Sequence, residues 1–200
     1  MISTLQQVDT DLLIFLNSLH CDMLDPVMKA MTGRFIWIPL YVLLAAAVWV
    51  KLGPRRAIFS FLLIGLTILM ADQICNSIIR PLALRLRPSN LDNPISSMIH
   101  VVDGYRAGRY GMASCHAANL AALVTYLLRT IAFRRGIVIL LILWAVIVVY
   151  TRIYLGVHYP GDIIVGATVG ILVALATSTL FRRYSPRVLT LHLPHLSLRL

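Results

Sequence analysis

The sequence predicts an all-α membrane protein, a polytopic bundle of about six helical elements in a single domain over residues 1–200. Of its residues, 59% are hydrophobic and only 13% are charged, whereas a soluble domain usually carries about 25% charged residues. The mean hydropathy is +0.83. The apolar residues are also gathered into long runs, and a helix needs about 20 such residues to cross a bilayer.

Residues 1–33 are mixed in character and form the first part of the chain. The apolar stretch Asp11–Leu19 is too short to span, and aspartates and a proline interrupt the residues after it. We therefore expect two short helices that lie in the membrane interface or are half-inserted, joined near residues 20–25. A single tilted span over residues 11–31 is the alternative.

Five longer apolar runs come next, and we expect each to cross the membrane as a helix. They are Phe35–Val50, Ala57–Ile79, Ser114–Thr130, Ile137–Tyr150 and Ile163–Phe181. The last run contains Gly166 and Gly170, a spacing of small residues that lets helices pack closely. The tail, residues 188–200, alternates leucine with polar residues, which is typical of a strand-like or interfacial segment.

The basic residues predict the orientation of the bundle. The loops after the first, third and fifth runs carry the clusters Lys51/Arg55/Arg56, Arg129/Arg134/Arg135 and Arg182/Arg183/Arg187. These clusters fall on one side, which is cytoplasmic by the positive-inside rule and includes the C-terminus. Residues 80–113 and 152–162 then meet on the outer face. Five arginines lie there against the rule, which a polyanionic ligand would explain: Arg80, Arg85, Arg87, Arg106 and Arg109.

The formal net charge of +10 does not indicate nucleic-acid binding, because the basic residues lie in short loops between apolar runs. The cysteines, Cys21, Cys75 and Cys115, show no CxxC spacing, so we predict neither a metal knuckle nor a disulfide framework. We expect no cleavable signal peptide, since no basic segment precedes the first apolar stretch.

The segment from Tyr150 to Asp162 is the strongest candidate for a functional site. It places Arg152, His158 and Asp162 at the rim of a membrane segment, where ionisable groups are costly. His158 and Asp162 are four residues apart, so a helical turn would put them on one face. A carboxylate fixes the tautomer of a neighbouring imidazole and raises its basicity, and an arginine offers a cationic fork for a phosphate or carboxylate.

Three segments on the predicted outer face together resemble the signature of the type 2 phosphatidic acid phosphatase superfamily. The segments are Arg80–Pro88, Ala113–His116 and Thr151–Asp162. The signature reads Lys-x6-Arg-Pro, Pro-Ser-Gly-His and Ser-Arg-x5-His-x3-Asp, and this chain keeps its order. Lysine, proline, glycine and serine of the signature are replaced by Arg80, Ala113, Cys115 and Thr151.

The resemblance implies a membrane lipid phosphatase that needs no metal and no other cofactor. His158 would attack phosphorus to give a phosphohistidine, with Asp162 keeping its far nitrogen protonated. His116 would protonate the leaving oxygen and then activate water. The other implied residues bind the phosphate: Arg80, Arg87, Ser114, Cys115 and Arg152.

For the substrate, the resemblance implies a lipid phosphate that enters from the outer leaflet of a bacterial inner membrane. Undecaprenyl diphosphate is favoured, and phosphatidylglycerophosphate, phosphatidate and lipid A phosphates are the alternatives. A lipid phosphotransferase would use the same phosphohistidine with another acceptor. An anion transporter is a further alternative, although no internal repeat is visible. The sequence leaves the oligomeric state open.

Four further polar residues have simpler interpretations. Arg85 is expected to be interfacial, with its stem along apolar surface and its charge in water. Asp72 lies inside the second run and is expected to form hydrogen bonds within the bundle. His20 and His100 show no partner pattern and are assigned no function.

Overall fold

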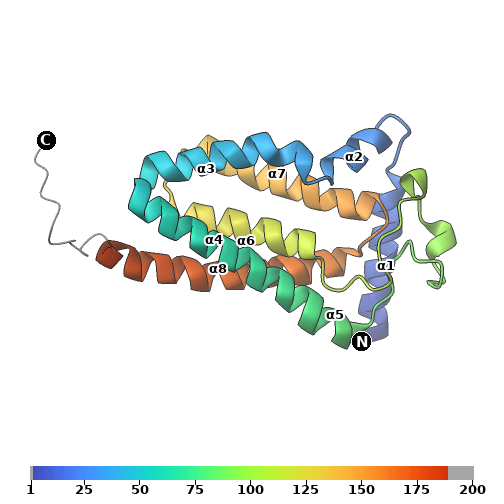
Figure 1. The fold of residues 1–200 in the computed structure, drawn as a ribbon. Helices are drawn as coiled ribbons and strands as arrows, with labels where there is room; N and C mark the ends of the chain where they lie inside the picture. The colour runs from blue at the N-terminus through green and yellow to red at the C-terminus, as the bar shows by residue number, and fades with distance from the viewer. Residues whose placement is uncertain (1, 189–200) are drawn as a thin grey trace, which may run out of the picture.

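Five long helices run side by side in the computed structural model, which describes residues 2–188 (Figure 1). They are α3 (Ile38–Leu52), α4 (Pro54–Gln73), α6 (Cys115–Thr130), α7 (Arg135–Tyr154) and α8 (Pro160–Val188). The shorter helices are α1 (Ile2–Ser18), α2 (Asp25–Met31) and α5 (Arg80–Ala83). The described residues form no β-strand, so the all-α prediction is confirmed. Residues 189–200 of the predicted tail lie outside the described residues.

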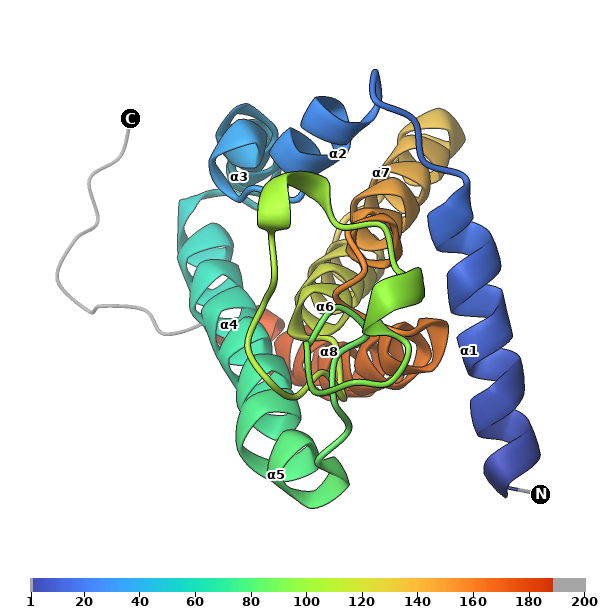
Figure 2. The same cartoon turned by 90° about the vertical axis from the view of Figure 1, so that its right-hand side faces the viewer.

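Four of the five predicted spans are long and apolar enough to cross a membrane: Phe35–Leu52, Pro54–Ala83, Arg135–Tyr154 and Pro160–Ser185. The fifth is α6, whose 16 residues give a length of about 24 Å, less than the roughly 30 Å hydrocarbon core. α6 lies at the centre of the bundle, with α3, α4, α7 and α8 around it (Figure 2). Because its neighbours are protein rather than lipid, α6 does not need the full length of a lipid-facing span.

Glycines allow α8 to lie directly against α6. A Cβ atom on Gly166 would overlap the Ser114 carbonyl group, and one on Gly170 would overlap the Ala118 carbonyl group. The close packing predicted from the spacing of Gly166 and Gly170 is therefore confirmed. This contact holds the first turn of α6 beside the first part of α8.

The N-terminal residues form two helices, as expected, with a break at residues 19–24. The alternative of one span over residues 11–31 is wrong, because turns at this break separate α1 from α2. α1 begins at Ile2 and lies across one end of the bundle, against α7 and α8 (Figures 1 and 2). Its outward side exposes apolar side chains, as in an interfacial helix: Leu5, Val8, Leu12 and Phe15.

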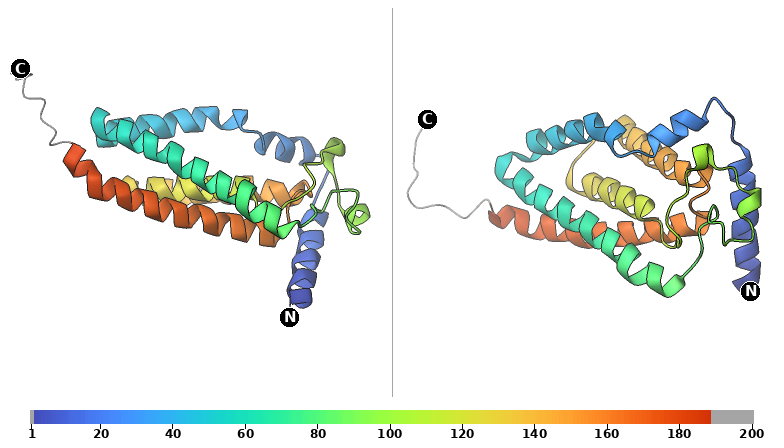
Figure 3. Two further views of the ribbon diagram at one scale, coloured as in Figure 1. Left: turned by 60° about the horizontal axis from the view of Figure 1, so that its bottom comes forward. Right: turned by 45° about the vertical axis from the view of Figure 1, so that its right-hand side comes forward.

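The two ends of the bundle are formed by different segments of the chain. α1, α2, residues 84–114 and the α7–α8 connection gather at one end, and the α3–α4 and α6–α7 turns lie at the other (Figure 3). The predicted meeting of residues 80–113 and 152–162 at one end is confirmed. Which side of a membrane each end faces stays a prediction.

Candidate functional site

The α7–α8 connection brings Arg152, His158 and Asp162 together. α7 ends at Tyr154, and the chain turns at Gly156, whose φ of +65° favours glycine. The His158 and Val157 amides both donate to the Arg152 carbonyl oxygen, at 3.2 and 3.0 Å. The three signature side chains are almost completely buried, with 4% of Arg152, 2% of His158 and none of Asp162 exposed.

Asp162 links His158 to the start of α6. Its Oδ2 atom lies 3.4 Å from Nδ1 of His158 and accepts the Tyr159 amide at 3.1 Å. Its backbone carbonyl oxygen accepts the Ser114 amide at 3.0 Å. The second and third signature segments are therefore joined through Asp162.

Arg87 determines which nitrogen of His158 carries a proton. Nη1 of Arg87 lies 2.9 Å from both Nε2 of His158 and the Val157 carbonyl oxygen. A guanidinium group only donates hydrogen bonds, so Nε2 must accept and the proton lies on Nδ1, toward Asp162. Burial lowers the pKa of His158 to about 4, and the cations Arg87 and Arg152 add to this effect while Asp162 opposes it. His158 is therefore neutral at pH 7.

Arg80 comes directly after a π-helical segment, Ile74–Ile79, at the end of α4. Such segments are frequent at functional sites because they re-aim the residues after them. Nη2 of Arg80 donates to the Ala113 carbonyl oxygen at 3.3 Å and lies 3.2 Å from Sγ of Cys115. Nη1 donates to Oδ1 of Asn76. Arg80 is thus held beside the second signature segment.

Asp72 supports this arrangement from inside the bundle. Asn76 donates to one of its carboxylate oxygens at 2.8 Å, and Asn119 donates to the other at 3.3 Å. The predicted hydrogen bonding of Asp72 within the bundle is confirmed. Asn119 lies one helical turn after His116, so Asp72 ties the Arg80 side of the site to the His116 side.

Each of the three signature arginines has one donor group that is not satisfied. The Nε atoms of Arg80, Arg87 and Arg152 are all buried without a hydrogen-bond partner. Arg152 uses Nη1 to donate to the Thr32 hydroxyl group. Burial, and then the charges of Arg80 and Arg152, lower the pKa of Arg87 to about 10. Crowded, partly unsatisfied cations of this kind have the donors and the charge to bind an anion.

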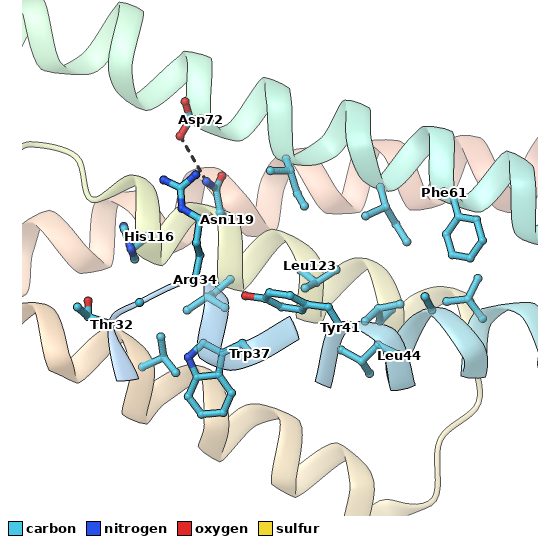
Figure 4. Close-up of a pocket in the computed structure, with 18 residues that line it drawn as sticks. Thr32, Arg34, Trp37, Tyr41, Leu44, Phe61, Asp72, His116, Asn119 and Leu123 are labelled. Atoms are coloured by element: carbon cyan, nitrogen blue, oxygen red, sulfur yellow. Dashed lines mark hydrogen bonds between the residues drawn. The ribbon is translucent and has the colours of Figure 1, made fainter. Parts of the chain in front are cut away.

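The second signature segment begins α6. Ser114 is fully buried and caps the helix, its hydroxyl oxygen accepting the Ala117 amide at 3.5 Å. Cys115 contacts Arg80, as described above. His116 forms a hydrogen bond with the Thr32 backbone, and both residues lie at the same end of a pocket (Figure 4). Thr32 therefore connects His116 to Arg152.

The pocket has a volume of about 660 Å³ and lies between α3, α4, α6 and α7. Most of its wall is apolar, and its polar end contains Thr32, Arg34, Asp72, His116 and Asn119 (Figure 4). Neither His158 nor the three signature arginines line it. Of the signature residues, His116 alone is among those that line the pocket.

Arg85 was expected at the membrane interface, and that expectation is wrong. Its guanidinium group lies 2.7 Å from an oxygen of Asp9 and 3.2 Å from Oδ1 of Asp162, and 3.6 Å from the centre of the Tyr159 ring. Two carboxylates and an aromatic face hold the charge more strongly than the interface would. Asp9 is one of two aspartates in α1, so nothing in the sequence singles it out as a partner of Arg85.

His20 and His100, which were assigned no function, do have partners. Nε2 of His100 lies 2.9 Å from Asp25, and the two histidine rings stack at 3.6 Å. His100 and Asp25 are 75 residues apart in the chain, so no local pattern reveals the pair.

Comparison with known proteins shows the family to which this chain belongs. Residues 58–186 match the PAP2 superfamily. A lipid A 4'-phosphatase of Bacteroides thetaiotaomicron is 44% identical over 170 residues, which cover 85% of this chain and 75% of that protein. A lipid A 4'-phosphatase of Porphyromonas gingivalis is 31% identical over 169 residues, covering 84% and 70%.

Two solved structures share the fold. The crystal structure of Aquifex aeolicus LpxE has a TM-score of 0.64 at 19% identity, over 85% of this chain and 94% of that one. The transmembrane PAP2 type phosphatidylglycerolphosphate phosphatase of Bacillus subtilis has a TM-score of 0.63 at 20% identity, over 94% and 90%. Fold, signature and sequence similarity agree: the chain belongs to the PAP2 superfamily and is a membrane lipid phosphatase.

Proposed function

We propose that this phosphatase removes a phosphate group from a lipid A-type glycolipid through a phosphohistidine on His158. The observation that carries the chemistry is the set of buried, unpartnered Nε–H groups on Arg80, Arg87 and Arg152. A buried donor without a partner costs about 1–3 kcal/mol. Arg87 contacts the neutral His158, and the charges of Arg80 and Arg152 act on Arg87, so the three donors favour a ligand with several anionic oxygens, such as a phosphate group.

In the first step, the lone pair on Nε2 of His158 attacks phosphorus, and the bond from phosphorus to the lipid oxygen breaks. The negative charge of the bound phosphate favours the protonated form of His116, which gives its proton to that oxygen. The three arginines hold the non-bridging oxygens, and Asp162 stabilises the positive charge that develops on the imidazole. The guanidinium groups supply the positive charge that phosphoryl transfer needs, so we expect turnover without an added metal.

In the second step, His116 takes a proton from water, whose oxygen attacks phosphorus as the bond to Nε2 breaks. Inorganic phosphate leaves, and His158 returns to its neutral form. Release of free phosphate distinguishes this hydrolysis from the phosphotransferase alternative, in which a second lipid or sugar receives the phosphate.

Two observations support a lipid A-type substrate. The two curated relatives are both lipid A 4'-phosphatases, and one is 44% identical to this chain. The apolar pocket of about 660 Å³ that begins at His116 has room for part of an acyl chain. Undecaprenyl diphosphate, favoured from the sequence, has no comparable support and becomes a competitor in the assay.

We further propose that the site faces the periplasm and that the C-terminus is cytoplasmic. The clusters Lys51/Arg55/Arg56 and Arg129/Arg134/Arg135 lie at the bundle end opposite the site (Figure 3). The positive-inside rule places such clusters in the cytoplasm. The site would then meet the outer leaflet of the bacterial inner membrane.

The test is a phosphate-release assay on the purified protein with four lipids: lipid A, undecaprenyl diphosphate, phosphatidylglycerophosphate and phosphatidate. We expect the fastest release from lipid A, inhibition by vanadate and no effect of EDTA. His158→Ala and His116→Ala should abolish release, while His20→Ala, a histidine outside the site, keeps it. Full activity in His158→Ala contradicts the mechanism, and faster turnover of another lipid contradicts the substrate assignment.

A further inference from the structure

α1 presents a narrow stripe of side chains to the end of the bundle. Asp9, Leu13 and Asn17 are spaced four residues apart and therefore lie on one face. Leu13 and Asn17 are buried, and the Asp9 side chain is 15% exposed. Asp11, on the same helix, is exposed, and its one side-chain hydrogen bond among the described residues comes from Gln7 on α1 itself. The two aspartates are thus a matched pair, one facing the bundle and one facing away.

Asn17 holds the end of α7. Its amide nitrogen donates to the Tyr154 carbonyl oxygen at 2.7 Å and lies 3.3 Å from the Ile153 and His100 carbonyl oxygens. Its Oδ1 atom accepts the His100 amide at 2.8 Å. The last carbonyl groups of a helix have no partner within the helix, and Asn17 satisfies that of Tyr154, the last residue of α7.

Asp9 holds the start of α8. Its Oδ1 atom accepts the Gly161 amide at 2.7 Å, in the first turn of that helix. A carboxylate there satisfies a free N–H group and is favoured by the helix dipole. Its other oxygen lies 2.7 Å from Arg85. A Cβ atom on Gly161 would come within 2.7 Å of the Asp9 carboxylate, so a side chain at this position would push the carboxylate aside.

α1 therefore contacts both ends of the segment that carries Arg152, His158 and Asp162. From Asp9 the contacts continue through Arg85 to Oδ1 of Asp162, at 3.2 Å, while Oδ2 of Asp162 faces His158. Without Asp9, Arg85 would be left with Asp162 as its single carboxylate partner among the described residues. The attraction between Arg85 and Asp162 would then be stronger and would draw the Asp162 carboxylate away from the His158 imidazole.

We propose that α1 is a positioning element of the phosphatase and that Asp9 is a positioning residue that aligns Asp162, and through it His158. This inference rests on the proposed function, because it assumes that His158 is the nucleophile. Asp9 acts through Arg85 and Gly161, so its loss changes the orientation of the nucleophile and leaves phosphate binding by the arginines in place. A displacement of about 1 Å at a reacting group can lower a rate about 100-fold.

The experiment compares steady-state kinetics of the purified variants Asp9→Ala, Asp9→Asn, Asp9→Glu and Asp11→Ala on the preferred lipid phosphate. We expect kcat of Asp9→Ala to fall about 10- to 100-fold with KM within about threefold. Asp9→Asn should be intermediate, since its amide oxygen still accepts from Gly161 but no longer pairs with Arg85. Asp9→Glu should recover part of the rate, and Asp11→Ala should match the wild type.

Thermal unfolding of each variant shows whether a lower kcat belongs to a folded protein, as positioning requires, or to one that has lost its fold. If Asp9→Ala does not fold, Asp9→Asn and Gly161→Ala decide the question, because each weakens one of the contacts while α1 stays whole. An unchanged kcat in the folded Asp9 variants, or a loss confined to KM, overturns the inference. Activity retained by His158→Ala would instead contradict the proposed function, whatever the Asp9 variants do.

Discussion

Nη1 of Arg87 lies 2.9 Å from Nε2 of His158, and Oδ2 of Asp162 lies 3.4 Å from Nδ1 on the other side of the ring. The imidazole is therefore held between a group that only donates and a group that, when ionised, only accepts. This arrangement leaves a lone pair on the nitrogen that faces the arginines. That lone pair accepts a hydrogen bond from Arg87, so a bound phosphate would have to take over this Arg87 donor before Nε2 could attack.

The tautomer of His158 can be tested with Asp162→Asn. The asparagine amide group can donate to Nδ1, which would move the proton to Nε2, the nitrogen beside Arg87. We expect kcat for phosphate release to fall by about 1,000-fold or more, as for other catalytic histidines that lose their carboxylate. Asp92→Asn, in the loop of residues 84–114, is the control, since Asp92 is exposed and pairs with Arg109. A loss of less than tenfold would contradict this role of Asp162.

The stability of the protein should depend on pH through His158. Its pKa is lowered to about 4 in the folded protein, against about 6.5 in the unfolded chain. Between these values the unfolded chain binds more protons, so the free energy of unfolding decreases as the pH falls from 6.5 to 4. This group contributes about 3 kcal/mol to that decrease. Unfolding in detergent at both pH values should show a smaller decrease in His158→Gln; an equal one would contradict the assignment.

The α6–α8 contact predicts opposite effects for two glycine substitutions. Gly170→Ala would place a methyl group against the Ala118 backbone, which cannot move aside as a side chain can. We expect it to destabilise the protein by about 1–3 kcal/mol. Gly65→Ala in α4 meets open space and should be neutral or slightly stabilising. Detergent unfolding midpoints check both, and equal midpoints would show that α6 and α8 do not depend on this close approach.

The proposed topology can be tested with a native cysteine. Cys21 is exposed at the end of the molecule that carries the site. We expect an impermeant thiol reagent to label it in intact cells with a permeabilised outer membrane, and labelling should disappear in Cys21→Ser. In that background, Arg55→Cys at the opposite end should react only after lysis. The reverse pattern would invert the orientation.

Several features of the fold could be predicted from the sequence because they depend on composition along the chain. Runs such as Ile137–Tyr150 must be helical in a bilayer, where each backbone group needs a partner within the protein. The two-helix N-terminal region and the packing of Gly166 and Gly170 were also predicted. The length of α6 was not, because its burial depends on the four helices around it.

The candidate site, too, could be predicted only in part from the sequence. The sequence by itself determined the signature residues, including Arg152, His158 and Asp162, because they belong to short motifs with defined spacing. Only the tertiary structure decided that Arg85 pairs with Asp162 and that Asp9 binds Gly161, a contact across 152 residues of chain. Contacts between distant segments depend on how whole helices pack, and no local pattern of residues specifies them.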